Sequence, residues 1–426
     1  MPLQPPLVTA CCTCATVSWL RISSQSSVLS CQFMEFLLHG HEFNLKGANR
    51  GFFTSRLRAN LELMLEGCGC TIGMRGLGLL VSCPIEHAAA VRARLQRALG
   101  VQTITAGERT EPEAGAIAPV ALAAIAAQRG PTFALDVQRP DKALALRSYD
   151  VAVAVGRYIE ERLGLPVDLE QPARKCTILL SRKGALVSRG AETGPGGMPA
   201  GTAGRMVALL SSGFDSPVAA YRMIRRGARA GLLHFYATPP AGQGSSVPAV
   251  EALARQLTRY QLHTRLYLCP FVPVQQAIVA AAPSRFRVLL YRRMMLRIAA
   301  AVATTAHAHG LITGDSLGQV ASQTVLNLEA VSAAVRLPIY RPLIGDDKHA
   351  IQAEARAIGT FAISSEQTED CCSAFMPRSP ALSSSPDELA AAERDLPTDE
   401  LVRAAVDGIQ TVRLKLAGGE PATAAT

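Results

Sequence analysis

The sequence lacks any run of apolar residues long enough to cross a membrane. No stretch reaches the roughly 18 consecutive apolar residues expected of a spanning helix. The start also lacks the basic residues of a secretory signal, since none precedes Arg21. We therefore predict no membrane partner and a place in the reducing cytoplasm. There the 11 cysteines would serve as core, catalytic or metal-binding residues rather than in disulfides.

The sequence also has no zinc motif and few lysines. Residues 11–14 hold one Cys-x-x-Cys, but no second pair follows at zinc-ligand spacing, so we predict no zinc site and assign no metal ligand. Residues 1–30 show no periodicity and are predicted to be a disordered or misassigned start. Six of the 43 basic residues are lysines, so arginine carries most of the formal charge of +9. This excess favours an anionic partner, with nucleic acid as the leading candidate.

One segment combines an apolar run, a turn of small residues and an amphipathic run. Residues 206–210 are apolar, residues 211–216 read Ser-Ser-Gly-Phe-Asp-Ser, and an amphipathic stretch runs from Pro217 to Gly227. Proline suits the first helical turn and glycine the position just past the last one. We predict a strand, a tight turn and a helix whose N-terminus can bind phosphate. No Gly-Lys-Ser/Thr follows, which excludes a Walker loop.

Alternating strand and helix patterns predict an α/β fold with a doubly wound parallel sheet in the second half of the chain. Strands are expected at 206–210, 230–236, 264–269 and 310–313, and helices near 216–226, 248–260 and 284–306. The predicted divisions are a start (1–30), a small α/β domain (31–86), a second α/β domain (87–192), a glycine-rich linker (193–203), the doubly wound domain (204–380) and a C-terminal helical tail (381–426).

Several motifs resemble one family. Residues 211–216 resemble the pyrophosphatase loop, or PP-loop, of ATP-dependent adenylating enzymes, usually written Ser-Gly-Gly-x-Asp-Ser. Residues 313–324 resemble the second signature of the tRNA 4-thiouridine synthetases, and further matching segments lie at 341–348, 358–360 and 369–372. Residues 42–50 resemble the start of that family's N-terminal ferredoxin-like domain. The middle unit resembles a THUMP domain, an RNA-binding module.

This resemblance implies ATP-dependent sulfur transfer to tRNA. The O4 atom of a tRNA uridine would attack the α-phosphate of ATP, and sulfur from a cysteine persulfide would then replace AMP, giving 4-thiouridine. ATP with Mg²⁺ would be the cofactors, and tRNA and a cysteine desulfurase the partners. The family also supplies sulfur for thiamine biosynthesis. The absence of a rhodanese domain puts that role in doubt, and the sequence leaves open whether the chain forms a homodimer.

The resemblance also implies roles for particular residues. Cys371 would resolve the acceptor persulfide or carry sulfur itself, and Asp215 would position metal or phosphate. The implied ATP contacts are Leu209, Leu210, Ser211, Ser212, Gly213, Ser216, His234, Phe235, Arg292, Gly314 and Gln323. Candidate RNA contacts are Lys46, Asn49, Arg50, Arg56, Arg58, Arg139, Lys142 and Arg147. Cys176 and Cys269, on apolar strands, are predicted to be core residues.

Ser212 is the main departure from the family pattern, because it replaces a glycine where backbone meets phosphate. A positive φ would be unfavourable for serine there, whereas a negative φ would be harmless. Two alternatives stay open. One is another PP-loop adenylating tRNA-modifying enzyme, although neither a Cys-x-x-Cys in the catalytic domain nor a glutaminase domain is seen. The other is a non-catalytic RNA-binding THUMP protein with a decayed loop.

Overall fold

A computed structural model describes residues 33–40, 42, 45, 47–75, 78–139, 144–182, 184–240, 242–366 and 380–416. The described chain divides into two compact units. One comprises residues 108–189, and the other joins residues 33–107 with residues 190–416. Two strands, β4 (Thr103–Thr110) and β7 (Gly184–Thr193), are divided between the units. Cys371, Lys46 and Lys142 lie outside the described residues.

The smaller unit packs two helices against strands. Helices α3 (Ala114–Ala126) and α4 (Ser148–Leu163) share one core with β5 (Phe133–Gln138) and β6 (Arg174–Ser181). Strand β6 pairs in parallel with β5 and antiparallel with β7. Cys176 on β6 is fully buried in this core, which confirms its prediction as a core residue.

Residues 33–110 follow the order β-α-β-β-α-β of a ferredoxin-like fold. The elements are β1 (Phe33–His39), α1 (Arg50–Met64), β2 (Thr71–Arg75), β3 (Gly78–Pro84), α2 (Ala88–Leu95) and β4, with short 3₁₀ turns at Gly47–Asn49 and Ile85–His87. Strand β3 lies antiparallel between β1 and β2. The fold therefore reaches beyond the boundary expected at residue 86, because α2 and β4 complete it.

The second half of the chain forms a six-stranded sheet in the order β12-β11-β8-β9-β10-β13. Its strands are β8 (Arg205–Leu209), β9 (Arg229–Tyr236), β10 (His263–Pro270), β11 (Leu311–Ile312), β12 (Ile339–Tyr340) and β13 (Gln410–Lys415). The first five are parallel, whereas β13 runs antiparallel to β10. This confirms the predicted parallel sheet and its four expected strands.

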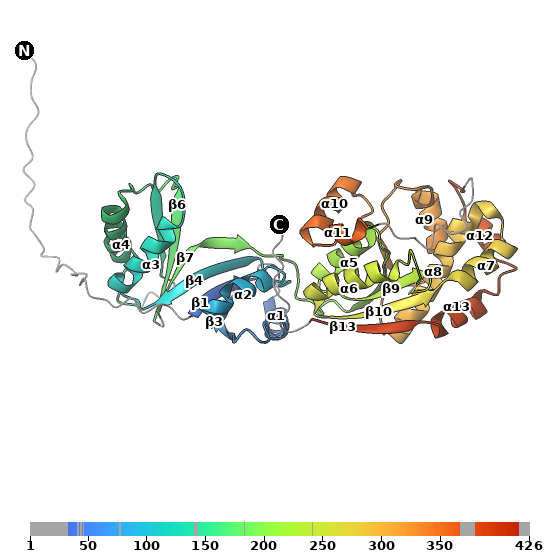
Figure 1. Cartoon of the computed structure of the whole chain (residues 1–426), viewed down its shortest axis with the longest axis horizontal. Coiled ribbons are helices and arrows are strands. Elements are labelled where there is room, and N and C mark those ends of the chain that lie inside the picture. The colour runs from blue at the N-terminus through green and yellow to red at the C-terminus, as the bar shows by residue number, and fades with distance from the viewer. Residues whose placement is uncertain are drawn as a thin grey trace, which may run out of the picture. The chain divides into compact units, whose positions relative to one another are not determined.

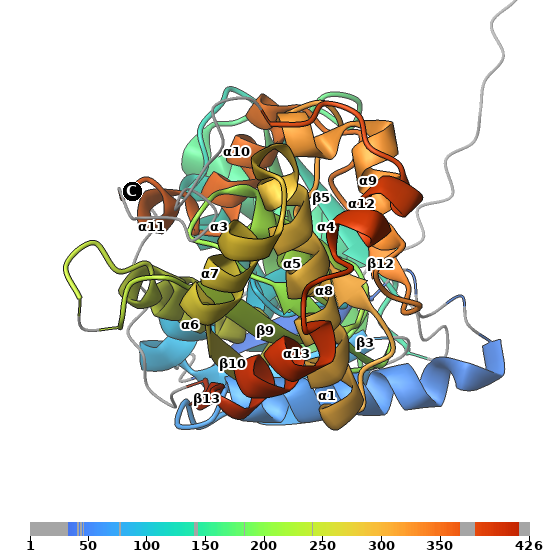
Figure 2. The ribbon, with the colours of Figure 1, turned by 90° about the vertical axis from the view of Figure 1, so that its right-hand side faces the viewer.

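Helices cover both faces of this sheet because apolar side chains alternate along its strands. On β8, Ala208 belongs to the core shared with α5 (Asp215–Arg225), α6 (Val247–Gln261) and α10 (Lys348–Ala357). Val207 belongs to the opposite core. That core holds α7 (Val272–Ala281), α8 (Arg287–Thr305), α9 (Val325–Ser332), α12 (Pro386–Ala392) and α13 (Thr398–Asp407). Figure 1 shows α5 and α6 along β9, and Figure 2 shows α13 beside α8.

The C-terminal segment belongs to this fold rather than forming only a helical tail. After α12 and α13, β13 pairs with β10 at the sheet edge, an element that the sequence did not indicate. Glu393, which follows α12, is buried and accepts hydrogen bonds from Arg293 and Arg297 on α8 at 2.7–2.8 Å. The short helix α11 (Phe361–Ser364) completes the described helices. None of the helices in the described ranges is long and apolar enough to cross a membrane.

Candidate active site

The two nucleotide-binding motifs meet where the strand order of the sheet reverses. Strand β9 lies on one side of β8 and β11 on the other. Ligands of doubly wound sheets bind beyond the carboxyl ends of the strands at such a point. Residues 210–214 follow β8, and residues 313–315 follow its parallel neighbour β11. The fold therefore brings together segments about a hundred residues apart in the sequence.

Gly314 lies directly against the start of α5. A Cβ atom added at Gly314 would lie 2.8 Å from the backbone nitrogen of Ser216 and 2.9 Å from the carbonyl carbon of Asp215. Both neighbours are backbone atoms and cannot rotate away. Only glycine fits this contact, so Gly314 sets the distance between the two motifs.

Hydrogen bonds between Ser211 and Ser216 join the two ends of the PP-loop. The backbone N–H of Ser211 donates to the Ser216 hydroxyl at 2.8 Å, and that hydroxyl donates to the Ser211 carbonyl at 3.2 Å. Pro217 lies in the first turn of α5, and Gly227 follows its last turn with φ +90°, as predicted. Apart from glycines, the described residues with positive φ are Leu262 and His307. Ser212 therefore has a backbone conformation that serine adopts without cost.

A cavity of about 480 Å³ opens beside the loop and α8. Most of the residues that the sequence assigned to ATP converge on it: Leu209, Leu210, Ser211, Asp215, Ser216, His234, Phe235, Arg292, Gly314 and Gln323 all line it. Ser212 and Gly213 lie in the same loop but do not line the cavity. Their roles toward ATP, like those of the lining residues, remain predictions.

His234 is held in place by hydrogen bonds on both ring nitrogens. It is buried, with Nδ1 2.8 Å from the Leu210 carbonyl and Nε2 2.8 Å from the Ser246 hydroxyl. Because a carbonyl only accepts, Nδ1 donates to Leu210. The ring thus fixes the end of β8 next to the cavity. Phe235 packs edge-on against Phe271 with ring centroids 5.1 Å apart, so it forms part of the cavity's apolar wall.

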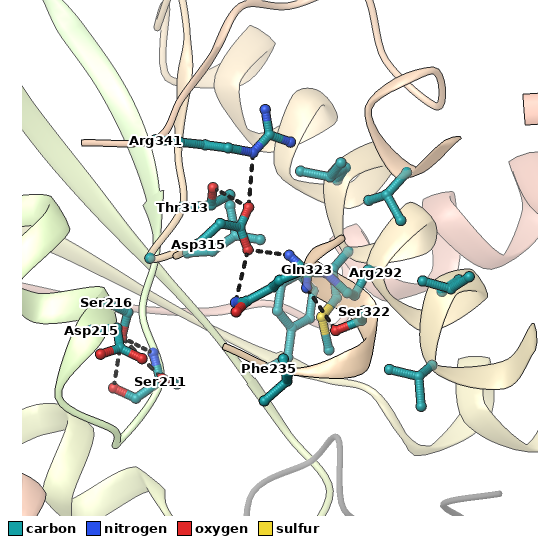
Figure 3. A pocket seen from close by; sticks show the side chains of 18 of the residues that line it. Ser211, Asp215, Ser216, Phe235, Arg292, Thr313, Asp315, Ser322, Gln323 and Arg341 are labelled. Carbon is teal, nitrogen blue, oxygen red and sulfur yellow. Dashed lines mark hydrogen bonds and ion pairs between the residues drawn. The ribbon is translucent and has the colours of Figure 1, made fainter. Parts of the chain in front are cut away.

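Asp315 is the centre of a hydrogen-bond network that sequence reasoning did not assign (Figure 3). Its buried carboxylate forms an ion pair with Arg292 and accepts hydrogen bonds from Arg341 Nε at 3.0 Å and Thr313 Oγ1 at 2.8 Å. Burial alone would raise the pKa of Asp315, but the charges of Arg292 and Arg341 and the Thr313 hydrogen bond outweigh it and lower the pKa. The carboxylate therefore stays ionised.

Two neighbours leave polar groups facing the cavity. Arg292 also donates to the Ser322 hydroxyl at 3.0 Å, so its guanidinium is held along the cavity wall. Gln323 donates from Nε2 to Asp315 at 3.4 Å, while its buried Oε1 has no hydrogen-bond partner among the described residues. A buried acceptor without a partner favours a ligand that donates to it.

Asp215 lies at the end of the cavity where α5 begins. Burial raises its pKa, and the nearby charge of Asp315 adds to this effect, while a hydrogen bond from Gln319 and the charge of Lys348 oppose it. The Gln319 amide lies 3.4 Å from the Asp215 carboxylate. Over the described residues, no group of three or more His, Cys, Asp or Glu side chains could hold a metal by itself.

The sequence contained one signal for the Asp315 network, whose residues Thr313, Asp315 and Arg341 were not predicted as site residues. Thr313 and Asp315 stand in the segment 313–324 on either side of Gly314, where two polar residues follow an apolar strand. Arg341 also lies in a matching segment, but it comes from another part of the chain and no local pattern links it to Asp315. Arg139 donates to the Leu144 carbonyl at 2.8 Å, and its predicted contact with RNA stays a prediction.

A doubly wound sheet with a PP-loop before α5 and a cavity at its switch point defines a nucleotide-binding domain of the PP-loop class. The family model described as "Thiamine biosynthesis protein (ThiI)" matches residues 201–397. A "Probable tRNA sulfurtransferase" of Thermus thermophilus is 43% identical over 86% of this chain and 90% of its own length. That of Moorella thermoacetica is 36% identical over 90% and 98%. The chain belongs to the tRNA sulfurtransferase family of enzymes.

A solved structure supports the same fold over nearly the whole chain. It is the "Crystal structure of a 4-thiouridine synthetase - RNA complex with bound ATP", with a TM-score of 0.83 and 28% identity. The match covers 90% of this chain and 100% of the other. This confirms the predicted combination of ferredoxin-like, THUMP and PP-loop folds.

Proposed function

We propose that this chain is an ATP-dependent tRNA uracil 4-sulfurtransferase. The observation that carries the proposal is the convergence of Ser211–Ser216 and Thr313–Asp315 on one cavity at the switch point of the sheet. The solved relative that was crystallised with RNA and ATP supports both partners. The proposal takes tRNA as acceptor, a cysteine desulfurase as sulfur source and the cytoplasm as location.

ATP would lie with its phosphates at the N-terminus of α5 and its base toward α8. The helix start and the loop N–H groups supply positive potential and hydrogen bonds for the phosphates. The side toward α8 is apolar, with Phe235, Leu289 and Met295 in the wall. The unpartnered Oε1 of Gln323 is suited to accept a hydrogen bond from an exocyclic amino group.

In the first step, the uracil O4 bonds to the α-phosphorus while the bond from that phosphorus to the β-phosphate oxygen breaks, and the N3 proton of the base is lost to water. Pyrophosphate leaves with the electron pair of that bond. Arg292 and the N-terminus of α5 border the cavity and oppose the charge that develops on the leaving group. The carboxylate of Asp215 would hold a Mg²⁺ ion, since Mg²⁺ is usually held by one or two carboxylates and phosphate oxygens. When bound, the ion would neutralise phosphate charge.

In the second step, the terminal sulfur of a cysteine persulfide bonds to uracil C4, and AMP leaves with the electrons of the C4–O4 bond. Cys371 would then attack the inner sulfur of the persulfide, or, where Cys371 itself carries the sulfur, a second cysteine would make that attack. The sulfur–sulfur bond breaks with its electron pair going to the sulfur on C4, and the two cysteines form a disulfide. Two external thiols supply the two electrons that reduce this disulfide before the next turnover. Adenylation is needed because the free uracil oxygen is a poor leaving group.

The test uses the full chain with tRNA, ATP, Mg²⁺, cysteine and a cysteine desulfurase. Pyrophosphate release reports the first step, and 4-thiouridine in digested tRNA, measured by mass spectrometry, reports the second. We expect the wild-type chain to do both. Cys371→Ser should release tRNA-dependent pyrophosphate but form no 4-thiouridine, whereas Asp215→Asn should lose both.

The outcomes separate the competing functions. Pyrophosphate release with a different modified nucleoside would replace the proposal by another PP-loop adenylating enzyme. Binding of tRNA without any pyrophosphate release would leave a non-catalytic RNA-binding protein. Loss of pyrophosphate release in Cys371→Ser would contradict the role assigned to that cysteine.

A further inference from the structure

A second pocket lies at the amino ends of the parallel strands of the six-stranded sheet. The ATP cavity lies at their carboxyl ends. The second pocket has a volume of about 230 Å³ and forms where β8, β9 and β10 begin and β13 ends. Six of its lining residues are basic or histidine: Arg205, Arg229, His263, Arg265, Arg413 and Lys415. Not one acidic residue stands among the described residues that line it.

The register of the sheet aligns four of these side chains in one row. Arg205 on β8 is the partner of Arg229 on β9, and His263 on β10 is the partner of Lys415 on β13. The parallel register of β9 and β10, continued to the start of β10, sets Arg229 beside His263. With strands about 4.8 Å apart, the row spans about 14 Å. We call it the basic row.

A second pair lies beside the basic row. Arg265 and Arg413 are direct cross-strand partners, two residues further along β10 and β13 and thus on the same face as the row. The strand beside Arg265 carries Gly231, where an added Cβ atom would lie 3.1 Å from the Tyr267 ring, so glycine lets that ring lie close to the strand. Arg265 and Arg413 are both exposed.

The described residues do not neutralise these like charges with ion pairs. Arg229, His263, Arg265, Arg413 and Lys415 form no ion pair with any described residue. Burial lowers the pKa of Arg229, and the charges of Arg56 and Arg205 lower it further. Burial and the charges of Arg229 and Lys415 also lower the pKa of His263. Like charges directly opposite each other destabilise a sheet, so the arrangement favours an anionic ligand.

We propose that the basic row, with Arg265 and Arg413, binds the phosphate backbone of the tRNA. The inference rests on the proposed function, which supplies RNA as the partner. A row about 14 Å long suits a linear series of phosphates better than one small anion. Arginine dominates it, as is common where phosphates are bound in pairs of hydrogen bonds. Arg56 on α1, which lies close enough to lower the pKa of Arg229, extends the positive field toward the ferredoxin-like fold.

The test is the salt dependence of tRNA binding to the full chain, measured by fluorescence anisotropy. Each lost phosphate contact lowers the slope of log affinity against log salt by about one. The double variant Arg265→Gln/Arg413→Gln should therefore lose about two from this slope. Between 50 and 200 mM salt, wild-type affinity should fall roughly tenfold further than that of the variant. The melting temperature of the variant should not fall, because the substitution removes a repulsion.

A matched control makes the same charge change elsewhere. Arg394→Gln/Arg403→Gln removes two exposed arginines from the α12–α13 region and should leave the slope unchanged. An unchanged slope in Arg265→Gln/Arg413→Gln would overturn the proposal. A calorimetric titration with pyrophosphate, with a non-hydrolysable ATP analogue filling the ATP cavity, tests a small anion instead. Pyrophosphate binding that the double variant loses while its tRNA slope stays unchanged would reassign the pocket to small phosphates.

The two proposals fail in different ways. Absence of 4-thiouridine from the wild-type reaction contradicts the proposed function and says nothing of the slope. A wild-type chain that forms 4-thiouridine, combined with equal slopes in the wild type and in Arg265→Gln/Arg413→Gln, contradicts the basic row alone.

Discussion

Asp315, which follows β11, forms an ion pair with Arg292 on α8, and Arg341 donates to the same carboxylate at 3.0 Å. This network joins three segments of the chain beside the cavity at the switch point of the sheet. Breaking a buried pair by removing one partner leaves the remaining charges uncompensated. We therefore expect Asp315→Asn to lower the free energy of unfolding by about 2 kcal/mol at neutral pH. Denaturant unfolding measures this change.

The pH dependence identifies the charge as the cause. The folded-state pKa of Asp315 lies below its unfolded value of about 3.9, so its stabilisation is complete above that pH and is lost as the pH falls through the folded pKa. The difference between wild type and Asp315→Asn should shrink below about pH 4. Asp395→Asn, on an exposed turn, is the control and should change stability little. A stability difference that does not change with pH would show that Asp315→Asn acts through side-chain packing rather than through the lost charge.

We expect Gly314→Ala to push the loop that follows β8 (residues 210–214) away from the segment that follows β11 (residues 313–315). The new Cβ would lie 2.8 Å from the Ser216 nitrogen, and neither backbone can move without shifting the start of α5. We expect ATP affinity to fall at least tenfold, measured by calorimetry, with a lower melting temperature. Gly345→Ala is the matched control, because no atom lies within 4 Å of a Cβ at that position. Equal ATP affinity in both variants would contradict the importance of this contact.

Ser212→Gly tests whether the departure from the family loop weakens this enzyme. Ser212 does not adopt a positive φ and does not line the cavity. Glycine would therefore relieve no strain, and ATP affinity and kcat/KM for pyrophosphate release should change less than about twofold. A gain of tenfold or more would show that the serine obstructs the phosphates.

Local patterns were sufficient to predict the parallel sheet and the strand, turn and helix around residues 206–227, because apolar runs and the turn between Leu210 and Pro217 act within a few residues. The same patterns did not reveal β13. It pairs with β10 across more than 140 residues of sequence, and the short alternation of Val412 and Leu414 with polar residues does not show which strand it joins. The partners of Asp315 were missed for a related reason. Arg292 and Arg341 meet it only after α8 and β12 have packed against β11.

Cys176 and Cys269 provide a test of the predicted cysteine chemistry. Both are fully buried, and burial raises the pKa of each to about 12. At pH 8 roughly one molecule in 10⁴ then carries the thiolate, which is the form that reacts with alkylating reagents. Iodoacetamide followed by peptide mass spectrometry should leave both residues unmodified in the native chain and modify them after denaturation. Native labelling of Cys269 at the rate of a free cysteine would contradict its place in the core beneath α13, where its Sγ lies 3.6 Å from the Ala405 carbonyl.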